Sequence, residues 1–211
     1  MTAGTKSLYY DESHEAFRDT VRRFVEKEIS PFVDEWDEAG GFPRELYKKA
    51  ADVGILGLGY PEEYGGSPCD QFHRIVLSQE LARSGAGGVS ASLMSHTIGS
   101  PPILAVGPQA MKERVLPQVL SGEKISALAI TEPSGGSDVA QLKTTARREG
   151  DHYIVNGSKM FITSGVRADF YTVAVRTGGP GASGVSLLLI ERGMEGFTQQ
   201  PLRKMGWWVS D

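Results

Sequence analysis

The spacing of the apolar residues changes at about residue 125, and this change limits what the chain can fold into. Before it, apolar residues recur at helical spacing, and such a stripe must pack against another element. One stripe is formed by Phe17, Val21, Phe24 and Val25. After it, short β-favouring runs alternate with turn residues. We therefore predict an α+β protein, with an all-helical module over residues 1–125 and a β-barrel-like module over residues 126–211.

Capping and turn residues mark the ends of the predicted helices. Asp70 is a good N-cap for the helix that follows it, and Gly54 suits the residue after a helix. Pro31 and Pro108 suit first helical positions, where a missing N–H costs nothing. The small residues of segment 89–97 favour a helix that packs closely against its neighbours or against a ligand.

The β module shows one clear turn signal. Asn156-Gly157 supplies the two positive-φ positions of a type I′ turn, so we predict a hairpin whose second strand covers residues 159–163. Two further strands are predicted over residues 170–175 and 186–190, with a flexible glycine-rich loop between them.

The composition excludes several classes of protein. With 211 residues, of which 40% are hydrophobic, the chain can bury a core and is not intrinsically disordered. The net charge of −4 lacks the basic excess of a nucleic-acid binder. The single cysteine, Cys69, cannot form an internal disulfide. No secretory signal or membrane-spanning run is present, so we expect a cytoplasmic protein with no membrane or nucleic-acid partner.

The residue types that bind metals show no site-forming pattern along the sequence. The histidines are His14, His73, His96 and His152. They lack metal-ligand spacing with one another and with Cys69, so we expect them to be structural or exposed and predict no metal site. Cys69 has no cationic neighbour in the sequence, which argues against a nucleophilic role.

Two segments carry residues suited to ligand binding. In segment 127–138 a β-run leads into a glycine-rich polar loop whose backbone N–H groups suit an anionic or carbonyl-rich ligand. This loop matches neither the GxGxxG nor the GxxxxGK[ST] pattern. In segment 160–164 an aromatic residue and a hydroxyl stand two residues apart, which on a strand places them on one face. Taken singly, the loop can equally be a plain connection and the pair a packing contact.

The order and spacing of these segments point to a known family. The first segment carries Thr131-Glu132-Pro133 and Ser137-Asp138, and the second carries Asn156-Gly157, Lys159 and Phe161-Ile162-Thr163. Together they resemble the two flavin segments of the acyl-CoA dehydrogenase family. Similar stretches at 61–66, 116–117 and 204–206 extend the likeness over nearly the whole chain.

The resemblance implies a three-domain enzyme with helical, β-barrel and four-helix domains in that order. Its cofactor is FAD, and it converts acyl-CoA to trans-2-enoyl-CoA, as in fatty-acid β-oxidation or related catabolism. Its electrons pass to an electron-transfer flavoprotein, and the full-length enzyme is a homotetramer.

The same likeness assigns ligand-binding roles to residues of both modules. The residues matching FAD-binding positions are Leu128, Ala129, Ile130, Thr131, Gly136, Ser137, Phe161, Ile162 and Thr163. Among them, the Thr131 hydroxyl matches a donor to the flavin pyrimidine, Thr163 a donor to flavin N5, and Phe161 a ring that shields one flavin face. The residues matching substrate-binding positions are Ser90, Leu93, Met94, Thr97 and Ser137.

The family's catalytic base is a glutamate of the C-terminal four-helix domain, which the resemblance places after the end of this sequence. We therefore assign no catalytic residue to the chain, and we expect residues 1–211 alone to be inactive or nearly so, since general-base catalysis needs a carboxylate at the reacting carbon. Two alternatives stay open: a flavin acyl-CoA oxidase, and a non-catalytic partner subunit that binds FAD and acyl-CoA.

Overall fold

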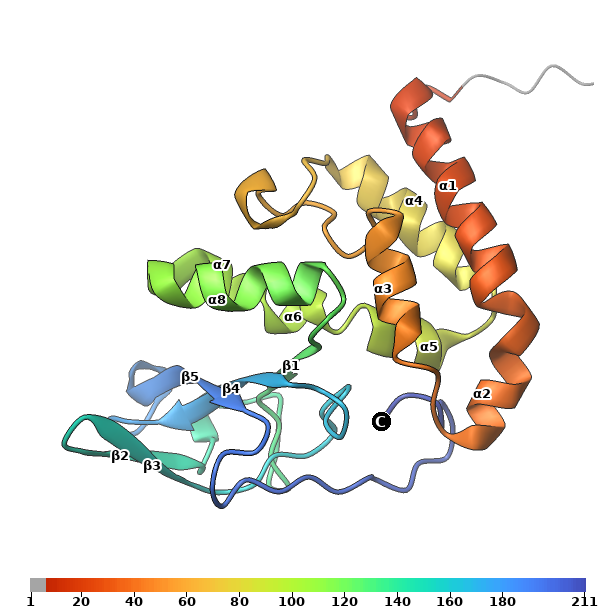
Figure 1. Cartoon of the computed structure of the whole chain (residues 1–211). Helices are drawn as coiled ribbons and strands as arrows, with labels where there is room; N and C mark the ends of the chain where they lie inside the picture. The colour runs from red at the N-terminus through yellow and green to blue at the C-terminus, as the bar shows by residue number, and fades with distance from the viewer. Residues whose placement is uncertain (1–6) are drawn as a thin grey trace, which may run out of the picture.

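A computed structural model describes residues 7–211 and shows a helical layer beside a mixed β-sheet (Figure 1). The helices are α1 (Glu12–Glu28), α2 (Val33–Ala39), α3 (Glu45–Asp52), α4 (Gln71–Ala82), α5 (Gly87–Leu93), α6 (His96–Gly99), α7 (Pro101–Val106) and α8 (Gln109–Leu120). The strands are β1 (Ser126–Ala129), β2 (Thr145–Glu149), β3 (His152–Asn156), β4 (Phe170–Arg176) and β5 (Val185–Glu191). Helices first and strands second confirm the predicted α+β order. Among the described residues, no helix is both long and apolar enough to cross a membrane.

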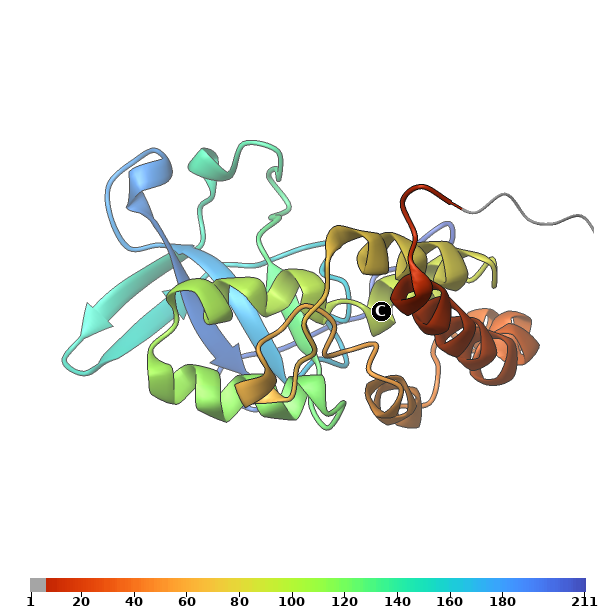
Figure 2. The ribbon, with the colours of Figure 1, turned by 90° about the horizontal axis from the view of Figure 1, so that it is seen from above.

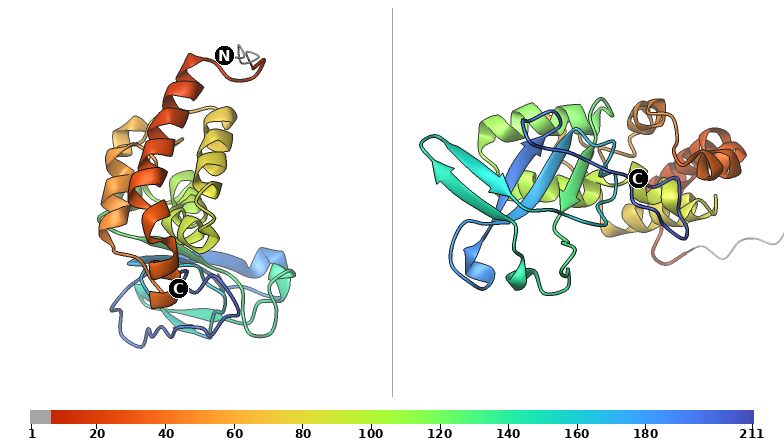
Figure 3. Two further views of the ribbon diagram at one scale, coloured as in Figure 1. Left: turned by 90° about the vertical axis from the view of Figure 1, so that its right-hand side faces the viewer. Right: turned by 90° about the horizontal axis from the view of Figure 1, so that it is seen from below.

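Helix α1 shows how the sequence sets local structure. The Asp11 carboxylate accepts the backbone N–H groups of Ser13 and His14, and the His14 imidazole accepts the N–H of Asp11, which completes a capping box. The predicted stripe turns inward, where Val21, Phe24 and Val25 are buried, and α1 lies along α4 (Figure 3). Helix α4 begins at the predicted cap, since Asp70 accepts the N–H of His73. Such caps contribute about 1 kcal/mol each.

The sheet is built around β4, which is buried along nearly its whole length. Strand β5 pairs antiparallel with all of β4, so the two parallel partners of β4 share its other edge: β1 pairs along residues 170–173 and β2 at Arg176. Strands β4 and β5 confirm the two strands predicted at 170–175 and 186–190, and Figure 2 shows the sheet beside the helices.

The predicted hairpin was wrong. Strand β3 pairs backwards with β2, and the tight turn lies at Gly150 and Asp151, where Gly150 has φ +63°. Residues 159–163 form no strand. Their backbone pairs instead with the loop after β1, because the Met160 N–H donates to the Thr131 carbonyl. A local turn signal could not reveal this competing long-range contact.

The small-residue segment 89–97 is helical, as expected, but it is split between α5 and α6. Small residues let α6 lie directly on β1. The hydroxyl of Ser95 donates to the Ser126 carbonyl, and that of Thr172 donates to the Gly99 carbonyl. A Cβ at Gly99 would lie 2.6 Å from the Ser126 hydroxyl and 2.9 Å from the Ala127 carbonyl carbon. The contact leaves no room for a larger residue.

One apolar core joins the helices to the sheet. It includes Val25 of α1, Leu93 of α5, Ala127 of β1 and Val173 of β4. The segment that follows β5 returns to the helices, where the Val209 N–H donates to Asp37 of α2 (Figure 1). The change of secondary structure near residue 125 therefore does not separate two cores.

Gly99 gives a test of the α6–β1 contact. We expect Gly99→Ala to lower the free energy of unfolding by about 1–3 kcal/mol, because the new methyl group overlaps backbone atoms of β1 that cannot move aside. Urea unfolding followed by circular dichroism measures this change. Gly179→Ala is the matched control, since a Cβ there meets no atom within 4 Å; equal effects of the two substitutions would contradict the close contact.

Candidate functional site

The two predicted ligand segments meet at a buried ion pair. The carboxylate of Glu132, only 5% exposed, accepts a hydrogen bond from the Lys159 ammonium at 2.9 Å. The same ammonium donates to the Ile130 carbonyl at 2.9 Å. The Thr131 carbonyl accepts the Met160 N–H at 2.8 Å. The loop after β1 and the segment after β3 are therefore held together as one unit, which we call the clamp.

Glu132 is fully engaged in the clamp. Its two carboxylate oxygens also accept the backbone N–H groups of Lys143 at 2.6 Å and Thr144 at 2.8 Å. Burial by itself would raise the pKa of Glu132, but these hydrogen bonds and that from Lys159 outweigh it and lower the pKa to about 2. A carboxylate held this firmly in its ionised form is a poor proton acceptor, which agrees with the prediction that Glu132 is not the catalytic base.

The clamp leaves three hydroxyls free on the neighbouring surface. Within residues 7–211, the side-chain oxygens of Thr131, Ser137 and Thr163 make no hydrogen bond to protein, and none of them is among the buried unpaired atoms. Gly136 packs against Thr131, where a Cβ would lie 2.9 Å from the threonine hydroxyl. Donors held in place, open and unpaired are what a polar ligand edge requires.

Phe161 lies beside these hydroxyls in sequence in an unusual conformation. Its backbone has φ +59° and its side chain is 69% exposed. A bulky residue in the left-handed region costs about 1–3 kcal/mol, so the surroundings must impose it. The segment that predicts a strand face thus places Phe161 on a strained turn, with its ring in solvent. Ile162 and Thr163 are half-buried after it.

The remaining predicted residues differ in exposure. Leu128, Ile130, Ser90 and Met94 are half-buried, Ala129 is buried, and Thr97 is exposed. Leu93 is fully buried in the common core, so it can support a ligand surface only from beneath. The Ser90 hydroxyl is a buried oxygen with no hydrogen-bond partner in the described part of the chain. Such an orphaned group suits an incoming polar ligand.

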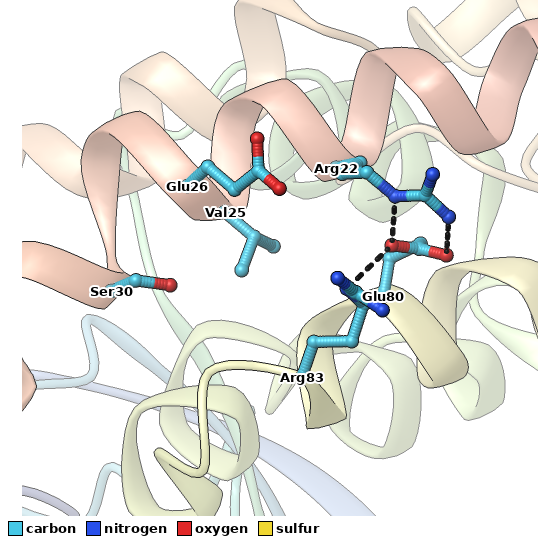
Figure 4. Close-up of a pocket in the computed structure, with 6 residues that line it drawn as sticks. All are labelled: Arg22, Val25, Glu26, Ser30, Glu80 and Arg83. Carbon is cyan, nitrogen blue, oxygen red and sulfur yellow. Dashed lines mark hydrogen bonds and ion pairs between the residues drawn. The ribbon is translucent and has the colours of Figure 1, made fainter.

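Two cavities lie away from all of these residues. One, of about 460 Å³, is lined by residues of α3, η2 (Glu62–Tyr64) and α8. The other, of about 140 Å³, lies between α1 and α4 (Figure 4). Buried Glu80 forms ion pairs there with Arg22 at 2.9 Å and Arg83 at 3.4 Å, and Arg22 and its neighbours lower the Glu80 pKa. This second cavity is walled by groups that already satisfy one another, and its network holds α1 on α4.

The histidines are placed much as expected, with one addition. His96 is buried and bonded to the Leu56 carbonyl at 2.9 Å, and burial lowers its pKa to about 4, so it is a neutral structural residue. His152 is exposed at the start of β3. His14 and His73, however, meet at Asp70, a contact between α1 and α4 that spacing along the sequence did not reveal.

Sequence reasoning placed Glu132 and Lys159 in the flavin segments but missed that they pair. One acid and one base in segments that already resembled a paired site were the available signal. The pairing needs the return of the chain after β3, which no local pattern encodes.

The fold and the clamp define an α+β protein with a hydroxyl-bearing ligand surface at the end of β1. Comparisons with known proteins identify the class more closely. The family model described as acyl-CoA dehydrogenase, N-terminal domain, matches residues 11–123, and the model described as acyl-CoA dehydrogenase, middle domain, matches residues 127–208. The long-chain specific acyl-CoA dehydrogenase, mitochondrial, of Rattus norvegicus is 38% identical over 99% of this chain and 49% of its own length.

Solved structures agree. An acyl-CoA dehydrogenase from Geobacillus kaustophilus has a TM-score of 0.90 at 38% identity, covering 98% of this chain and 55% of that one. An acyl-CoA dehydrogenase from Bacillus anthracis complexed with FAD has a TM-score of 0.86 at 30% identity, covering 98% and 35%. The chain belongs to the acyl-CoA dehydrogenase family, and it spans about half the length of the curated relatives it matches.

The clamp predicts an acid-sensitive stability. A Glu pKa lowered from 4.5 to about 2 in the folded chain adds stability that is complete above pH 4.5 and is lost as the pH falls toward 2. The difference corresponds to about 3 kcal/mol. We expect Glu132→Gln to cost most of this at pH 7 and little at pH 2.5, measured by urea unfolding at both pH values.

Glu149→Gln is the control for that experiment, because Glu149 is a half-buried glutamate of the sheet outside the clamp. A Glu132→Gln penalty that is the same at pH 7 and pH 2.5 would contradict the ionised, hydrogen-bonded state of Glu132.

Proposed function

We propose that this chain supplies the FAD-binding and acyl-CoA-binding surface of an FAD-dependent acyl-CoA dehydrogenase. The observation that carries the proposal is the clamp, which holds Thr131 and Thr163 on one unit with their hydroxyls open. The residues fit the cofactor, because an isoalloxazine ring offers several acceptors along one edge and an apolar face. The reaction is conversion of acyl-CoA to trans-2-enoyl-CoA.

The residues of the chain would act by binding and orienting. Thr131 would donate to the pyrimidine edge of the flavin and Thr163 to N5, and Phe161 would cover one ring face. Ser137 would bond the acyl-CoA, with Ser90, Met94 and Thr97 beside the acyl group. FAD, when bound, supplies the hydride acceptor. Fixed hydroxyl donors favour negative charge that develops nearby, without reorganisation during the reaction.

The proposal assigns no catalytic base to residues 7–211. Glu132 is excluded by its hydrogen bonds, since its ionised form is held by four donors. The base, the rest of the FAD site and the homotetramer contacts would come from outside the described residues. The same proposal places the protein in the cytoplasm, with acyl-CoA and an electron-transfer flavoprotein as partners.

The hydroxyl donors give a direct test. In the full-length protein that carries this chain, we expect Thr163→Val to reduce kcat for acyl-CoA dehydrogenation about tenfold or more, since it removes a donor at the reacting end of the flavin. An artificial electron acceptor provides the assay, and flavin absorbance gives the bound FAD. Thr20→Val on α1 is the control, since its hydroxyl only bonds the Ala16 carbonyl.

Unchanged turnover and unchanged FAD content in Thr163→Val would overturn the assigned role. A loss of folding would be recognised by circular dichroism and would not be counted as support.

The electron acceptor separates the proposal from an oxidase. We expect aerobic turnover of the full-length protein to give little hydrogen peroxide, and added electron-transfer flavoprotein to accelerate substrate consumption. Peroxide formed in a one-to-one ratio with enoyl-CoA would instead identify an acyl-CoA oxidase. Activity that appears only with a second chain of the same family would identify a partner subunit.

A further inference from the structure

The contact between the start of α1 and the start of α4 holds a group of metal-ligand atoms that the acyl-CoA chemistry does not use. His14, Asp70 and His73 each offer one ligand atom, and these atoms all lie within 4.8 Å of one another. The His14 Nε2 atom lies 3.0 Å from both Asp70 carboxylate oxygens, and the His73 Nδ1 atom lies 2.8 Å from Oδ1. The two imidazole rings face the same carboxylate, with centroids 4.2 Å apart.

These separations are close to those of a zinc site. Tetrahedral ligands at about 2.0–2.1 Å from Zn²⁺ stand about 3.3 Å from one another. The His–Asp separations of 2.8–3.0 Å need to open by only a few tenths of an ångström. The two imidazole nitrogens need to approach each other, which a rotation of the half-exposed Asp70 and His73 side chains would allow.

The surroundings of His14 are those of a metal-bound histidine. Its side chain is buried, and its second nitrogen, Nδ1, lies 2.8 Å from the Asp11 carboxylate. Metal-bound histidines commonly donate their other N–H to a carboxylate, which fixes the ring. Tyr10 and Phe72 pack edge-on against the His14 ring and hold it further.

The proton balance permits binding without net proton release. In the capping box the Asp11 N–H donates to His14 Nδ1, so the His14 proton lies on Nε2 toward Asp70. Metal at Nε2 requires this proton to move to Nδ1, where the Asp11 carboxylate accepts it, while the exposed Asp11 N–H turns to water. The His73 proton moves likewise from Nδ1 to Nε2.

Charge favours a dication here. Helix N-termini disfavour cations, but this position has two carboxylates, Asp11 and Asp70, which balance a 2+ charge. Two imidazoles and a carboxylate are ligands that zinc accepts, with water completing the shell at the exposed side of Asp70. From this geometry we propose that His14, Asp70 and His73 form a Zn²⁺ site that ties the start of α1 to the start of α4.

The test uses metal-free protein carrying the whole chain, titrated with Zn²⁺ by calorimetry, and with Co²⁺ followed by visible absorption. We expect one Zn²⁺ per chain, a Co²⁺ spectrum typical of four-coordinate nitrogen and oxygen ligation, and a higher Tm when Zn²⁺ is bound. Absence of stoichiometric Zn²⁺ binding by the unmodified protein would overturn the proposal.

Three variants test the ligand set. We expect His73→Gln to weaken Zn²⁺ binding at least tenfold, and Asp11→Asn to weaken it about tenfold while keeping a good N-cap. His152→Gln, in an exposed histidine beside Asp151, is the matched control and should bind as the unmodified protein does. Equal affinity in His73→Gln and the control would overturn the site, whatever the effect on folding of the third variant, His14→Gln. The proposal is independent of the proposed function, since neither readout uses FAD or acyl-CoA.

Discussion

The buried pair of Glu132 and Lys159 is the interaction on which the candidate site depends. A buried carboxylate is costly unless charge and hydrogen bonds compensate it, and here an ammonium and two backbone N–H groups do so. Because the donors come from three separate stretches of chain, satisfying this one side chain fixes the loop after β1, the start of β2 and the segment after β3. The open hydroxyls of Thr131 and Thr163 are placed as a consequence.

The strained turn at Phe161 follows from the same constraint. Lys159 and Met160 are held against the first segment, and the Ser164 N–H is bonded to the Asp211 carbonyl, so the intervening residues must turn within a short distance. The chain meets this by placing Phe161 and Ser164 at positive φ. The cost in backbone energy places an aromatic ring on the surface next to the hydroxyls, which a packing role would not require.

The sequence predicts those parts of the structure that are determined by local patterns. The stripe of α1, the cap at Asp70 and the buried run of β4 were all predictable, since helical period, capping and β-propensity act over a few residues. The segments of the site were found through their resemblance to a family. The hairpin at Asn156-Gly157 was wrong, because Gly150 provides the tight turn and the later residues bind Glu132 and Thr131. Long-range partners, such as His14 with Asp70, leave no periodic trace in a single sequence.

Hydrogen–deuterium exchange of the full-length protein, with and without FAD, tests the central claim most directly. If the clamp positions one flavin surface, FAD should slow exchange in segments 130–137 and 159–165 together, and should leave the start of α1 unchanged. Protection of one segment without the other, or protection confined to the α1–α4 contact, would contradict a shared FAD surface built on Glu132 and Lys159.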